Sequence, residues 1–80
     1  MSTRLLAEVG LSDYLEGSII GWFRRDGYTG TVIRPAYEFA LLIEKNKDTL
    51  WGAMEAELEQ LNRFVEDLRT STDTISIDLC

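Results

Sequence analysis

The sequence predicts an α+β fold that is mostly helical, with three helices and short strands in a single compact domain over residues 1–80. Two patterns lead to this prediction. Apolar residues recur at helical spacing through most of the chain, whereas the segment 74–79, Thr-Ile-Ser-Ile-Asp-Leu, alternates as a strand does. Eighty residues suffice for one domain at most, so we expect the helices and strands to share one core.

The first helix is expected over residues 12–25. Ser12 is a good N-cap, and Gly27 is placed to end the helix. Between these ends, apolar side chains recur at helical spacing: Leu11, Leu15, Ile19, Trp22 and Phe23. Gly17 and Gly21 weaken the helix, and we expect them to allow the close approach of another element.

A second helix is expected over residues 35–46, because proline suits the first helical position and the residues after it are apolar on nearly every side. Residues 37–43 also alternate as a strand would. Residues 29–33 are rich in strand formers, and residues 4–9 fit either a short strand or a helical turn. The C-terminal strand needs a partner, which is one of these two segments or the same strand of a second subunit.

A third helix is expected over residues 49–70, where apolar residues follow the spacing of a heptad seam. The residues of this seam are Trp51, Met54, Leu58, Leu61, Phe64, Val65 and Leu68. The stripe can pack on the other two helices as core, or it can form a seam with a partner or a second copy. Antiparallel pairing of two copies would bring Glu55 near Arg69 of the other copy.

The composition excludes several classes of protein. The chain has no histidine and a single cysteine, Cys80, so neither an internal disulfide nor a zinc site is expected. It also lacks a phosphate-binding glycine loop and a nucleophile-elbow motif. We therefore expect no catalytic residues, no metal, no cofactor and no enzymatic activity. Without a signal peptide or an apolar run of about 20 residues, the expected location is cytoplasmic, away from the membrane.

The net charge of −6 comes entirely from residues 36–80, since residues 1–35 are neutral. An acidic half repels phosphate backbones, so direct binding of nucleic acid is disfavoured and a basic protein surface is a more suitable partner. One broad side of the third helix carries a set of carboxylates: Glu55, Glu59, Glu66 and Asp67. Such a side suits a small acidic inhibitor, of the kind that phages and mobile elements encode, which occupies the basic, nucleic-acid-binding cleft of a host protein.

The run from Trp22 to Pro35 collects arginines, glycines and aromatic residues. It is either a contact site for an anion or partner, or a helix end followed by a glycine turn and a strand, with Trp22 and Phe23 in the core. The candidate contacts in the first interpretation are Trp22, Arg24, Arg25, Tyr28 and Arg34.

A domain of this size is marginally stable alone, and without disulfides or metal it is expected to gain stability by association. The sequence therefore predicts a non-enzymatic protein–protein interaction module that acts as a homo-oligomer, most simply a homodimer. The alternatives are the acidic inhibitor and a small anionic-ligand binder that uses the arginines.

Overall fold

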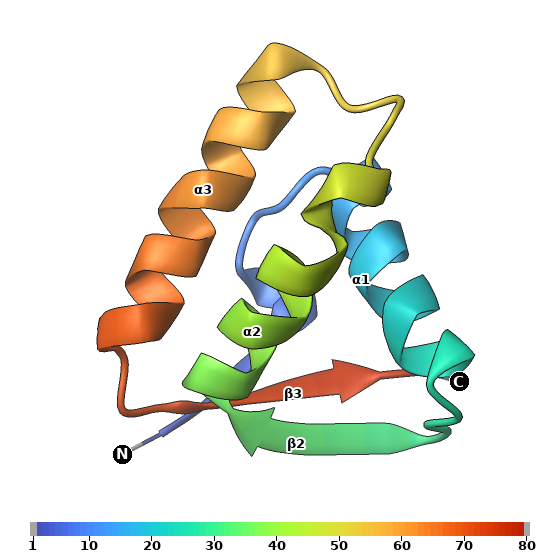
Figure 1. Ribbon diagram of the computed structural model, residues 1–80. Helices are drawn as coiled ribbons and strands as arrows, with labels where there is room; N and C mark the ends of the chain where they lie inside the picture. Colours follow the sequence, from blue (N-terminus) through green and yellow to red (C-terminus); the bar gives the residue numbers. More distant parts are fainter. Residues whose placement is uncertain (1, 80) are drawn as a thin grey trace.

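The computed structural model describes residues 2–79 and confirms the α+β fold (Figure 1). Its elements in chain order are β1 (Thr3–Leu5), a 3₁₀ turn (Leu6–Glu8), α1 (Asp13–Arg25), β2 (Thr31–Pro35), α2 (Ala36–Asn46), a second 3₁₀ turn (Lys47–Thr49), α3 (Glu55–Thr70) and β3 (Thr74–Asp78). Met1 and Cys80, the single cysteine, lie outside the described residues. The three helices lie on one side of the sheet, which leaves its other face uncovered (Figure 1).

The C-terminal strand β3 lies in the middle of the sheet, parallel to β1 and antiparallel to β2. It therefore pairs with both of the candidate segments within the chain and needs no second subunit for its ladder. Residues 4–9 combine both of the expected conformations, because a strand that ends at Leu5 continues as a 3₁₀ turn.

The outer edge of β2 offers an interrupted set of groups to a further strand. The bonds from Leu79 N–H to the Gly30 carbonyl and from Ala36 N–H to the Asp73 carbonyl set the alternation of the ladder. In this register Ile33 and Pro35 direct their backbone groups away from β3. Proline has no N–H, and the Ile33 carbonyl accepts a hydrogen bond of 2.8 Å from Arg34 Nη1. The edge is therefore interrupted at Ile33 and Pro35, whereas Thr31, which has the same orientation, also directs its backbone groups outward.

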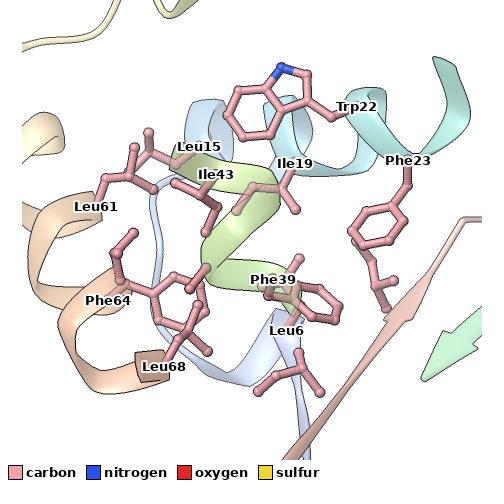
Figure 2. Close-up of a cluster of buried hydrophobic side chains, with 14 of the residues drawn as sticks. Leu6, Leu15, Ile19, Trp22, Phe23, Phe39, Ile43, Leu61, Phe64 and Leu68 are labelled. Atoms are coloured by element: carbon pink, nitrogen blue, oxygen red, sulfur yellow. The ribbon is translucent and has the colours of Figure 1, made fainter. Parts of the chain in front are cut away.

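The core lies between the helices and the inner face of the sheet, where Val32, Ile75 and Ile77 point inward. Figure 2 shows how side chains of all three helices meet there: Leu15 and Ile19 from α1, Phe39 and Ile43 from α2, and Leu61, Phe64 and Leu68 from α3. Trp22 and Phe23 are both buried, with 6% of each residue exposed. Residues 37–43 are helical throughout, so the strand alternative for them was wrong.

The third helix begins later than predicted, at Glu55 in place of residue 49. Residues 47–49 form a 3₁₀ turn, and buried Leu50 anchors the following loop in the core. Gly52 favours this irregular backbone over a helix. The heptad spacing therefore continues through a loop, and Trp51 and Met54 precede the helix.

The expected close approach at Gly17 and Gly21 is also wrong. A Cβ atom at either position would meet nothing within 4 Å. Both glycines lie on the exposed side of α1, so the prediction of a tight contact there fails. Their effect on the fold is confined to the weaker helix propensity of glycine.

We expect Gly17→Ala and Gly21→Ala each to raise the free energy of unfolding by about 0.5–1 kcal/mol, because alanine fits the space and favours the helix. Urea denaturation measures the change. Gly27→Ala is the control and is expected to destabilise, since Gly27 has a φ of +93°. A loss of stability on substitution at position 17 or 21 would contradict the open space that the structure shows beside these glycines.

Two leucines of the heptad stripe should respond differently to truncation. Leu61 is 1% exposed, so Leu61→Ala is expected to lower the free energy of unfolding by about 2–5 kcal/mol. Leu58 is 39% exposed, so Leu58→Ala should cost about 1 kcal/mol or less. The same urea titration measures both, and equal losses would contradict the division of the stripe into core and surface.

Candidate protein-binding site

Four large apolar side chains lie outside the core at the end of the molecule where α1 and α3 begin. Trp51 is 90% exposed and Met54 is 70% exposed, and Leu58 and Tyr14 are less so. The Tyr14 hydroxyl accepts a hydrogen bond of 3.3 Å from the N–H of Gly52, the neighbour of Trp51. Leu58 follows Met54 by one helical turn. We name these four residues the loop cluster.

The loop that carries Trp51 and Met54 is fixed by the residues around them. Leu50 is buried, and Ala53 packs against the core from the surface. The Leu50 N–H donates to the Lys47 carbonyl at 3.1 Å, and the Ala53 N–H donates to the Leu50 carbonyl at 3.3 Å. Each exposed side chain directly follows an anchored residue, Trp51 after Leu50 and Met54 after Ala53. The backbone that carries the exposed pair is therefore held in place.

A polar network joins the start of α3 to the start of α1. Glu57 accepts a hydrogen bond of 3.0 Å from the Met54 N–H and a second one of 2.6 Å from the Ser12 hydroxyl. The Ser12 oxygen in turn accepts from the Leu15 N–H at 3.2 Å, which confirms Ser12 as the N-cap of α1. One carboxylate thus supports both helix starts, and it places Tyr14 beside the loop.

Gln60 strengthens the same network. Its side-chain oxygen accepts from the Ser12 N–H at 3.0 Å, and its amide donates to the Gly10 carbonyl at 3.0 Å. These contacts fix the segment before α1 against α3. Glu57 and Gln60 are the positioning residues that sequence reasoning missed. Glu57 stands three residues after the N-cap of α3, which is the spacing of a capping box. That N-cap is Met54 in place of the usual serine or threonine, so the pattern was hard to recognise in the sequence.

The hydrogen bonds lower the pKa of Glu57 from its usual value of 4.5, since they stabilise the charged form. The bond from the Met54 backbone contributes most and the bond from Ser12 contributes next, while desolvation acts in the opposite direction. The Glu57 carboxylate therefore remains charged to a lower pH in the folded state than in the unfolded chain.

The structure divides the predicted seam into two groups. Leu61, Phe64, Val65 and Leu68 are buried in the core of their own chain and are not available to a partner. Arg69, which antiparallel pairing would have used, forms ion pairs with Glu44 and Glu66 of the same chain. What remains exposed from the seam is its N-terminal part, namely Trp51, Met54 and Leu58.

The predicted acidic face is divided as well. Asp67 pairs with Arg4 at 2.8 Å, and Glu66 lies 3.5 Å from Arg69. Glu55 and Glu59 are exposed, and within residues 2–79 neither has an ion-pair partner. The two unpaired carboxylates lie on the first turns of α3, next to the loop cluster.

The charge of the molecule is concentrated at the end that carries the loop cluster. Segments 11–18 and 44–60 meet there (Figure 1) and contain seven acidic and two basic residues, a formal net charge of −5, although one of the seven, Glu44, is paired with Arg69 outside these segments. The rest of the chain carries −1. This end therefore carries acidic side chains together with the exposed apolar ones, and Asp13 and Asp48 are exposed there as well.

The three arginines of the predicted anion site each bond to a different part of the chain. Arg24 donates two hydrogen bonds to the Leu79 carbonyl, at 3.2 and 2.7 Å. Arg25 donates to Asn46 Oδ1 at 2.6 Å. Arg34 bonds to the Ile33 carbonyl and lies 5.6 Å from the centroid of the Tyr28 ring. Trp22, the first residue of that predicted site, is in the core. The geometry thus supports a loop-cluster site better than an arginine site.

A hollow of about 410 Å³ lies beside β1, lined by Thr3, Arg4, Leu5, Glu8, Val9 and Asp67. The ion pair between Arg4 and Asp67 occupies its charged side. Among the residues described, no group of three or more acidic or thiol side chains is arranged to hold a metal ion. Within residues 2–79, no helix has the length and apolar character needed to cross a membrane.

No protein-family model, curated protein or solved structure matches this chain. The indications of its function therefore lie in the surface of the molecule, above all in the loop cluster and the charge near it.

Stability should depend on the charge of Glu57. A carboxyl whose pKa is lowered by folding stabilises the fold above its unfolded pKa, and this contribution is lost as the pH falls through the folded value. In urea denaturation, Glu57→Gln is expected to be less stable than wild type at pH 7. The difference should shrink below pH 4.5, the usual pKa, as Glu57 becomes protonated.

Glu59→Gln is the matched control for this experiment, because it removes an exposed carboxylate two residues further along α3. We expect its stability to stay close to that of wild type at both pH values. A Glu57→Gln deficit that does not change with pH would contradict the role of the Glu57 charge.

Proposed function

We propose that this chain is a non-enzymatic protein-interaction module whose contact surface is the loop cluster. The observation that carries the proposal is the 90% exposure of Trp51 on a loop whose neighbours are anchored in the core. Tryptophan is the residue type most enriched among the residues that dominate binding energy, and tyrosine is also enriched. The fixed backbone supports the proposal further, because less conformational entropy is lost on binding.

Two partners fit this proposal. The first is a second copy of the chain, as the heptad spacing predicts, which would cover the exposed part of the seam. The second is a protein with a basic surface, which the net charge favours. An inhibitor that occupies a basic cleft is a special case of the second partner. Glu55 and Glu59 are the carboxylates of the predicted acidic face that support such a role.

The loop cluster should matter for association and not for stability. The double variant Trp51→Ala/Met54→Ala removes the two most exposed side chains, so its free energy of unfolding should stay within about 0.5 kcal/mol of wild type. If the partner is a second copy, light scattering across a dilution series gives a dimer mass for wild type and a monomer mass for the variant.

The control is Tyr37→Ser/Leu41→Ser, which removes two apolar side chains that are similarly exposed on α2. Light scattering should give this control the same oligomeric state as wild type. A dimer that survives the loop-cluster variant would place self-association elsewhere and remove the second copy as the occupant of this surface.

A further inference from the structure

We infer that the occupant of the loop cluster is a cationic amphipathic segment of another protein, with apolar anchors flanked by lysine or arginine. This inference rests on the proposed function and specifies the chemistry of the partner.

The charge argues against a second copy at this surface. Two loop clusters in contact would bring two ends of net charge −5 together. Charges at an interface are separated by less than the Debye length of about 8 Å at physiological salt, so salt screens this repulsion only in part. Contact between two surfaces of like charge suppresses self-association. The same negative charge attracts and orients a cationic partner.

The area leads to the same conclusion. Four side chains, of which the aromatic ones bury about 150–250 Å² each when fully covered, give a patch of several hundred Å². A stable interface of standard size buries about 800 Å² on each partner. The apolar cluster alone is therefore small, and it suits a short segment whose basic side chains add contacts to the surrounding carboxylates. Glu55 and Glu59 are placed to receive such contacts, since both are exposed at the start of α3.

The chain contains its own reporter for this binding. It has two tryptophans, of which Trp22 is 6% exposed and Trp51 is 90% exposed. Burial of Trp51 by a partner should shift its fluorescence to shorter wavelength, while Trp22 already lies in the core. The Trp51→Phe variant retains only the signal of Trp22, so the difference between wild type and this variant isolates Trp51.

The test uses three synthetic peptides without tryptophan. The probe is an amphipathic helix with leucine on one face and lysine on the other. The first control has glutamate in place of every lysine, and the second has serine in place of every leucine. We expect only the leucine–lysine peptide to shift the Trp51 emission, with an affinity that falls as salt is added.

Variants locate the binding. Trp51→Ala, followed through a fluorophore on the peptide, is expected to weaken binding at least about tenfold, as for a dominant contact residue. Glu55→Gln/Glu59→Gln should weaken it several-fold and reduce its salt dependence. Leu41→Ser and Glu38→Gln are the matched controls on α2 and should leave the affinity unchanged.

Three results would overturn the inference: equal binding of the glutamate peptide, binding that Trp51→Ala does not weaken, or a dimer that the loop-cluster variant dissociates. The last result would keep the interaction module and replace only its partner. If neither self-association nor peptide binding depends on the loop cluster, the proposed function is wrong as well.

Discussion

The whole structure depends on the position of β3 between β1 and β2. This strand bonds to β1, near the start of the chain, and to β2, which begins at Thr31. Its side chains Ile75 and Ile77 are almost fully buried under the helices. Neither edge strand bonds directly to the other, so β1 and β2 form a sheet only through β3. The helices pack on the inner face of this sheet and on one another, so β3 and the three helices share one core.

The loop end shows how a small fold can hold an apolar surface outside its core. Leu50 and Ala53 face inward, while Glu57 ties the start of α3 to Ser12 at the start of α1. Because the burial of Leu50 and Ala53 and the hydrogen bonds of Glu57 anchor the loop, Trp51 and Met54 are not needed to stabilise it. Of the loop cluster, Tyr14 contributes to holding the loop, whereas the exposed side chains of Trp51 and Met54 can change without loss of these anchors.

Much of the fold could be predicted because local signals agree with the tertiary structure. The alternation of residues 74–79 identified β3, and Ser12 identified the start of α1. The start of α3 was missed because the heptad spacing passes without a break from helix into loop, and only the burial of Leu50 reveals the difference. Trp51 was predicted as a seam residue from its spacing. The environment of Trp51 could not be predicted, because the contacts of Ser12 with Glu57 and Gln60 join residues that are far apart in the sequence.

The interrupted edge of β2 has a consequence for assembly. An open sheet can act as a template on both sides, and successive copies can then add without limit to form a fibre. Here Pro35 lacks a donor and the Ile33 carbonyl is already bonded to Arg34, so two of the groups that a further strand would use at this edge are missing. The strand of another copy would therefore form a less complete ladder with β2 than with a continuous edge, which disfavours growth of the sheet on this side.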